Sequence, residues 1–133
     1  KEPEELEAIK AACNITRSAF FKVLSMIRPG IWEYEIEAEL VHEFRRAGMV
    51  PAYPGIVGGG ENGCILHYIE NSAPLKAGDL VLIDAGCELE CYASDITRTF
   101  PVSGKFSSEQ RALYEVVLAA QYEAIDAVRP GNH

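Results

Sequence analysis

Two stretches in the first third of the chain repeat apolar residues at the three- and four-residue spacing of an amphipathic helix. The first covers residues 3–27 and ends at Arg28-Pro29-Gly30, and the second starts near Ile36 and stops at Gly48. The apolar positions are Leu6, Ile9, Cys13, Phe20, Val23, Leu24 and Ile27, then Ile36, Leu40, Val41 and Phe44. We expect two helices, each with one buried face.

A third helix is predicted after Ser107, because Ser107 and Gln110 form the S-x-x-Q pattern of a capping box and apolar residues at helical spacing follow. This helix ends at Val128-Arg129-Pro130-Gly131, which is nearly the same sequence as the Ile27-Arg28-Pro29-Gly30 that ends the first helix. The recurrence has two explanations: an internal duplication whose second copy has just begun, or a common way of ending a helix.

Between the helices the pattern changes to short runs rich in β-branched and aromatic residues, separated by Gly, Pro and Asn. The runs are residues 53–57, 64–69, 80–83 and 92–102. Such closely spaced runs predict an antiparallel sheet built from hairpins. The expected fold class is therefore α+β, an antiparallel sheet flanked by helices.

The composition and charge of the chain narrow its possible functions. With 133 residues, 48% of them hydrophobic, the chain is long enough for one compact domain. A net charge of -8 disfavours nucleic acid and anionic membranes as partners, and no apolar run is long enough to span a bilayer. Because the amino-terminal segment is acidic, unlike a signal peptide, we expect a cytoplasmic protein. Its cysteines, Cys13, Cys64, Cys87 and Cys91, are then expected to be reduced thiols, not disulfides or a zinc site.

The most informative segment for chemistry is residues 80–100, which read as strand, turn and strand. If the hairpin turns symmetrically about Leu89-Glu90, Asp84 and Asp95 face each other directly across the strands. Two carboxylates this close cannot both ionise cheaply without a cation, and alternation places Arg98 on the opposite face. Paired carboxylate oxygens suit Mg²⁺, Mn²⁺ or a two-metal site. The alternative is that one aspartate caps a turn and the other is solvated.

Two further features lie just before this segment. His67 is expected within a strand, on the same side as Ile65 and Ile69, where it is either a catalytic group or a hydrogen-bonded core residue. Residues 58–63 match the G-x-G-x-x-G pattern of dinucleotide-binding proteins, but that pattern requires a helix next and the following residues read as a strand. We therefore interpret this segment as a turn or a substrate-lining loop.

Three motifs in a fixed order connect the chain to a known family. They are GENGCILHYIEN at residues 60–71, GDLVLIDAG at 78–86 and YASDITRTFP at 92–101. In these motifs, and over nearly its whole length, the chain resembles bacterial Xaa-Pro aminopeptidases (aminopeptidase P) and, less closely, prolidases. The resemblance implies a pita-bread fold, in which two related α+β halves surround a curved sheet. Residues 1–133 would form the first half of the catalytic domain, with the second half and an amino-terminal domain absent.

The same resemblance implies roles for three residues. Asp84 and Asp95 match the two aspartates of the family's dimetal centre, Asp84 as a terminal ligand and Asp95 as a bridging ligand. His67 matches a histidine that positions substrate without binding metal. The other family ligands, one His and two Glu, would come from the second half, so the metal site is expected to be incomplete here. The metals implied are two Mn²⁺ ions, with Co²⁺ and Zn²⁺ as alternatives.

The activity implied for the parent enzyme is removal of the first residue of a peptide whose second residue is proline, while this chain alone is expected to be inactive. Three alternatives stay open: a prolidase, a methionine aminopeptidase, or a half-fold that binds peptides without cleaving them. The partners expected are a peptide substrate and a second copy of the chain in a homodimer, with no nucleic acid and no membrane.

Overall fold

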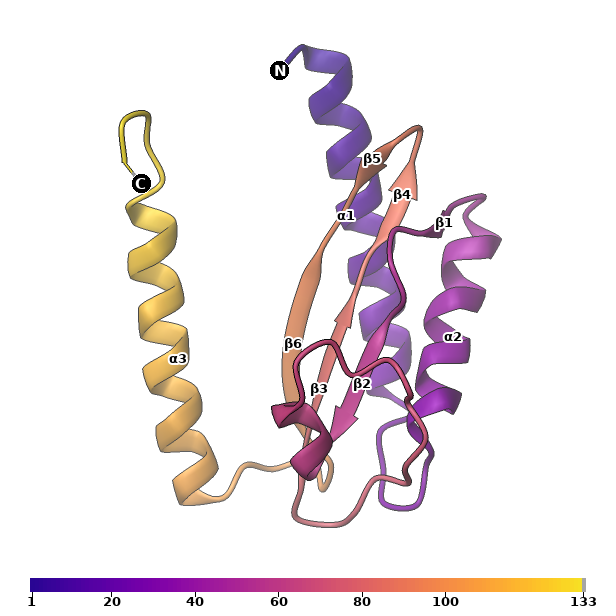
Figure 1. Ribbon diagram of the computed structural model, residues 1–133, viewed down its shortest axis with the longest axis vertical. Coiled ribbons are helices and arrows are strands. Elements are labelled where there is room, and N and C mark those ends of the chain that lie inside the picture. Colours follow the sequence, from indigo (N-terminus) through magenta and orange to yellow (C-terminus); the bar gives the residue numbers. More distant parts are fainter. Residues whose placement is uncertain (133) are drawn as a thin grey trace.

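Two helices pack together against the strands in the computed structural model, which describes residues 1–132 (Figure 1). Helix α1 spans Pro3–Leu24 and α2 spans Glu33–Arg46, and each contacts the other as well as the strands. The first two predicted helices are thus confirmed, and α1 ends slightly earlier than its apolar pattern indicated. Within the described residues, no helix combines the length and apolar character needed to cross a membrane.

Within residues 1–132 the strands form two three-stranded antiparallel sheets, which confirms the predicted sheet type. The sheet β2-β3-β6 joins Ile56–Gly59, Leu80–Ala85 and Ile96–Pro101, and the sheet β1-β4-β5 joins Val50–Pro51, Cys87–Leu89 and Tyr92–Ala93. Buried and half-buried residues alternate along β3, so Val81 and Ile83 face the helices. Asp84 consequently faces away from the core.

The hairpin that carries the two aspartates turns one residue later than predicted. Its turn is Glu90-Cys91 rather than Leu89-Glu90, so Asp84 faces Thr97 and not Asp95. Glu90 and Cys91 have φ angles of 50° and 69°, the positive values that a two-residue type I′ turn requires. The predicted direct pairing of Asp84 with Asp95 is therefore wrong, and the two residues are diagonal neighbours across the hairpin.

Residues 64–69 do not form the predicted strand. Gly60–Cys64 form a short 3₁₀-helix, η1, and His67 lies in the turn that follows, with a φ of 55° that an extended strand does not allow. The carboxylate of Glu33 accepts hydrogen bonds from two backbone N–H groups, one on either side of this segment. In a strand, such groups would donate to the carbonyls of a neighbouring strand. The strand-based orientation inferred for His67 is therefore wrong.

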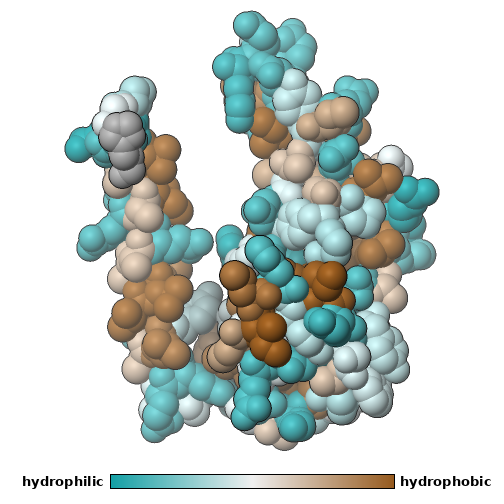
Figure 2. Space-filling model, in the orientation of Figure 1, coloured by the Kyte–Doolittle hydropathy of each residue, from teal (hydrophilic) through white to brown (hydrophobic). Residues whose placement is uncertain are grey.

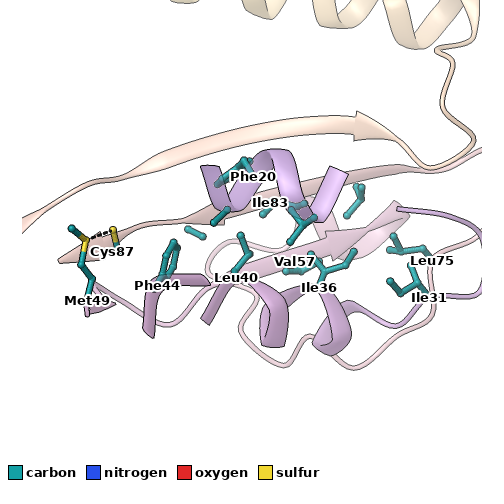
Figure 3. Close-up of a cluster of buried hydrophobic side chains, with 14 of the residues drawn as sticks. Phe20, Ile31, Ile36, Leu40, Phe44, Met49, Val57, Leu75, Ile83 and Cys87 are labelled. Atoms are coloured by element: carbon teal, nitrogen blue, oxygen red, sulfur yellow. Dashed lines mark hydrogen bonds between the residues drawn. The ribbon is translucent and has the colours of Figure 1, made fainter. Parts of the chain in front are cut away.

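The hydrophobic core lies between the helices and the sheet (Figure 3). Phe20 comes from α1, Leu40 and Phe44 from α2, and Val57 and Ile83 from β2 and β3. Each such side chain contributes about 1.5–3 kcal/mol when it is fully buried. This packing holds β2 and β3 in place, and β3 carries Asp84.

Helix α3, Ser108–Asp126, stands apart from the rest of the chain (Figure 1). Its capping box is confirmed: the N–H of Gln110 donates to Ser107 Oγ at 3.2 Å, and the N–H of Ser107 donates to Gln110 Oε1 at 2.9 Å. None of its residues is buried, and apolar side chains gather on it (Figure 2). Along and just beyond α3, the residues that are 58–83% exposed are Leu113, Val116, Val117, Tyr122, Ile125 and Val128. This apolar face is free to pack against another surface.

Both Arg-Pro-Gly sequences form the same kind of turn. Gly30 and Gly131 have φ angles of 89° and 91°, and the residue after each glycine donates its N–H to the carbonyl of the arginine, at 3.3 and 3.2 Å. Proline followed by a glycine with positive φ is the signature of a type II turn. Since turn chemistry alone produces this similarity, both explanations of the recurrence remain open.

The capping box of α3 gives a first testable prediction. Ser107→Ala removes the side-chain acceptor for the Gln110 N–H and should destabilise the first turn of α3 by about 1 kcal/mol. In the complete protein, hydrogen exchange of the Gln110 amide should become about fivefold faster. Ser108→Ala is the matched control, because the Ser108 hydroxyl donates to the side chain of Glu109 and not to the backbone. Equal exchange rates in the two variants would contradict the capping role.

Candidate metal centre

Asp84 and Asp95 are brought together where the chain passes from the sheet β2-β3-β6 to the sheet β1-β4-β5 and back. Gly86 follows β3, and Ser94 immediately precedes Asp95. A Cβ atom on Gly86 would lie 1.7 Å from the carbonyl oxygen of Ser94, so glycine is required for this approach. Ser94 is buried, and its Oγ lies 2.7 Å from the hydroxyl of Thr16 in α1. The position of Asp95 therefore depends on α1 as well as on the hairpin.

The hydroxyl of Tyr53 joins the two carboxylates. Its oxygen lies 2.7 Å from Asp84 Oδ1 and 2.9 Å from Asp95 Oδ1. The neighbouring N–H of Ala52 donates to the carbonyl of Gly86 at 2.9 Å, which holds the Tyr53 segment against the crossing. Tyr53 is not among the predicted site residues, because it precedes the aspartates by 31 and 42 residues and no local motif marks such a contact.

The two aspartates of this cluster have no positively charged partner within residues 1–132. Burial raises the pKa of the Tyr53 phenol well above its ordinary value, helped by its hydrogen bonds to Asp84 and Asp95, so the phenol keeps its proton. One proton bonds to one carboxylate at a time. No ion pair within residues 1–132 involves either aspartate, and the guanidinium of Arg98 donates to the carbonyl of Thr97 at 2.7 Å. A cation would relieve the repulsion between the two carboxylates.

The carboxylates line a pocket of about 400 Å³. Its other lining residues are Tyr53, His67, Pro54, Ile56 and Ile69. His67 is exposed here and also lines a second pocket that contains Asp84. The structure therefore brings the three predicted site residues together, although His67 lies on a turn and not on a strand. Its role in positioning substrate stays a prediction.

A buried carboxylate holds the turn that carries His67. Glu33 is 0% exposed, and four donors reach its carboxylate at 2.8–3.0 Å. They are the N–H groups of Gly59 and Ala73, the side-chain amide of Asn62 and the hydroxyl of Tyr68. These bonds compensate the desolvation of the charge. In the sequence Glu33 is one of several glutamates near a helix start, so nothing distinguishes it there.

The donor set of the aspartate pair fits a divalent cation. Carboxylate oxygens are hard ligands, of the kind that Mn²⁺ and Mg²⁺ prefer. Across residues 1–132, no three His, Cys, Asp or Glu side chains converge on one point. Since bound metals take four or more ligands, Asp84 and Asp95 can serve as part of a metal centre but need further ligands from outside these residues.

Two other candidate sites are not formed by the described residues. The glycine-rich segment leads into η1, a 3₁₀-helix of 5 residues, and not into the long helix that receives a pyrophosphate. Cys87 is buried in the core with its sulfur 3.3 Å from that of Met49 (Figure 3), whereas Cys91 is exposed in the hairpin turn. Cys13, Cys64, Cys87 and Cys91 form no disulfide with one another in the structure.

Fold and site together define an α+β protein with a carboxylate pair suited to divalent metal ions. The profile of metallopeptidase family M24 matches residues 7–133, and the chain belongs to this family. Membership implies that the function depends on divalent metal ions.

Relatives from other organisms agree with this family. The chain is 54% identical to the Xaa-Pro aminopeptidase of Haemophilus influenzae and 52% identical to that of Escherichia coli, in both cases over 133 residues and 99% of the chain. The matched regions are 31% and 30% of the two relatives, so the chain spans less than a third of their length.

Solved structures agree with the fold. A variant of Escherichia coli aminopeptidase P in complex with substrate matches with a TM-score of 0.95 and 52% identity over 98% of this chain and 30% of that chain. Pseudomonas aeruginosa aminopeptidase PepP matches with a TM-score of 0.96 and 52% identity over 100% of this chain and 30% of that chain. The predicted resemblance and the predicted pita-bread fold class are both confirmed.

Proposed function

We propose that the complete protein is a metal-dependent aminopeptidase that removes the first residue of peptides with proline in second position. The observation that carries this is the pairing of Asp84 and Asp95 at the Tyr53 hydroxyl, in a chain 52–54% identical to two Xaa-Pro aminopeptidases. Two divalent metal ions, with Mn²⁺ proposed as the native metal, would supply Lewis-acid polarisation of the peptide carbonyl and a more acidic water. The chain by itself, with two carboxylate ligands, is proposed to be inactive.

The pocket residues fit this function. Asp84 and Asp95 would hold the metals, Asp84 as a terminal ligand and Asp95 as a bridge. His67, exposed in the same pocket, would hydrogen-bond the substrate and orient it without binding metal. The apolar side chains of Ile56 and Ile69 would contact the apolar parts of the bound peptide.

The aspartate pair gives the test of this function. In the complete protein, Asp95→Asn should lower the affinity for Mn²⁺ by more than about 100-fold, because even residues outside the ligand set cost 10- to 100-fold when lost. Cleavage of an Ala-Pro-Ala tripeptide should disappear with it. Binding would be measured by calorimetric titration of metal-stripped protein, and Asp126→Asn, at the exposed end of α3, is the charge-matched control.

Substrate comparison separates the alternatives. Cleavage of Ala-Pro-Ala but not of Ala-Ala-Ala supports the proposal. Cleavage of Xaa-Pro dipeptides alone would favour a prolidase, and release of Met from Met-Ala-Ala would favour a methionine aminopeptidase. A wild-type protein that binds the tripeptide but neither binds Mn²⁺ nor cleaves would favour the non-catalytic half-fold.

The apolar face of α3 bears on partners. We propose that chain outside residues 1–133 covers this face in the complete protein, since the relatives are more than three times as long as the matched region and no residue of α3 is buried here. The alternative is a homodimer of this chain. Light scattering on the 133-residue chain separates the two, because a monomeric mass at working concentration would contradict the homodimer.

A further inference from the structure

Tyr53 is held in place from two directions. On one side its ring lies close to Gly86, where an added Cβ atom would approach Tyr53 Cε1 to 3.2 Å. On the other side its hydroxyl reaches Asp84 and Asp95 at 2.7 and 2.9 Å. Pro54 follows directly and restricts the backbone. A rigid ring therefore places one hydroxyl between two carboxylates.

The two hydrogen bonds use the same atom of each aspartate. Both go to Oδ1, and within the described residues no hydrogen bond reaches the Oδ2 atom of Asp84 or of Asp95. The hydroxyl, which donates its one proton to one carboxylate at a time, thus lies against one oxygen of each aspartate and leaves the other oxygen free. A side chain that fixes one oxygen of a ligand and leaves the other free is the arrangement by which neighbouring groups orient metal ligands.

We propose that Tyr53 is a positioning residue for the metal centre, whose hydroxyl holds Asp84 and Asp95 at ligand spacing before the metal ions bind. The proposal rests on the function of the two aspartates as metal ligands. Without the hydroxyl, the two carboxylates lose their shared hydrogen-bond donor and gain rotational freedom. Metal binding then has to restore the arrangement that Tyr53 provides in the wild type.

The test is Tyr53→Phe in the complete, metal-stripped protein, titrated with Mn²⁺ by calorimetry. Phenylalanine keeps the ring against Gly86 and removes the hydroxyl. The dissociation constant for Mn²⁺ should rise about 10- to 100-fold. Tyr92→Phe is the matched control, because it removes a hydroxyl that donates to Glu5 Oε1 at 2.9 Å, away from the pocket, and should leave the constant unchanged.

The melting temperature of the metal-free protein distinguishes positioning from general stability. Weaker Mn²⁺ binding with a metal-free melting temperature within about 4 °C of wild type supports the proposal. Unchanged or tighter binding overturns it, and so does a loss of cooperative melting or an equal loss of affinity in Tyr92→Phe. Failure of the proposed peptidase function would appear separately, as a wild-type protein that does not cleave Ala-Pro-Ala.

Discussion

Glu33→Gln is expected to lower the free energy of unfolding by about 2–4 kcal/mol. Both carboxylate oxygens of Glu33 accept two hydrogen bonds each, and the side chain is 0% exposed. In glutamine one oxygen becomes an NH₂ group, which would face either the N–H of Gly59 or that of Ala73. A buried donor left without its acceptor costs about 1–3 kcal/mol, and either orientation of the glutamine amide affects two of the four donors.

The measurement is urea unfolding of the complete protein. Glu39→Gln is the control, because Glu39 lies on the same helix, outside this hydrogen-bond network, and should change stability by less than about 0.5 kcal/mol. Since the network also holds the turn with His67, kcat/KM of Glu33→Gln should fall more than that of Glu39→Gln at a temperature where both are folded. Equal urea midpoints in the two variants would show that the buried carboxylate does not hold the loop.

Local patterns were sufficient to predict much of this fold. The spacing of apolar residues predicts the three helices, and the capping box from Ser107 to Gln110 marks the start of α3 within one residue. These features work because a helix start and an amphipathic face depend on residues three or four positions apart. The aspartate pair was predicted for a similar reason, since both residues belong to one hairpin.

What the patterns missed depends on contacts between distant segments. The turn at Glu90-Cys91 was misplaced by one residue because neither residue is a usual choice for positive φ. The segment with His67 has the composition of a strand, yet Glu33 from another element binds the Tyr68 hydroxyl and the backbone N–H groups on either side of the segment. Tyr53 likewise contacts Asp84 and Asp95 through tertiary structure alone. The candidate site was therefore predicted as a pair of aspartates, without the residues that hold them.

The second large effect is expected from Gly86→Ala. The added Cβ would lie 1.7 Å from the Ser94 carbonyl oxygen and 2.6 Å from its carbonyl carbon, and neither is the end of a flexible side chain. Ser94 cannot easily yield, because its Oγ lies 2.7 Å from the hydroxyl of Thr16 in the buried interior. Relieving the clash requires a backbone shift, with an expected loss of about 3 kcal/mol or more.

The shift would reach the proposed metal centre, because Asp95 is the residue after Ser94. Gly86→Ala should therefore weaken Mn²⁺ binding as well as lower the melting temperature of the complete protein. Gly55→Ala is the matched control: its Cβ would meet nothing closer than 3.9 Å, so an equal or slightly higher melting temperature is expected. Equal melting temperatures and equal Mn²⁺ affinities in Gly86→Ala and Gly55→Ala would contradict this. The close approach of the Gly86 and Ser94 backbones would then not be what places Asp95 beside Asp84.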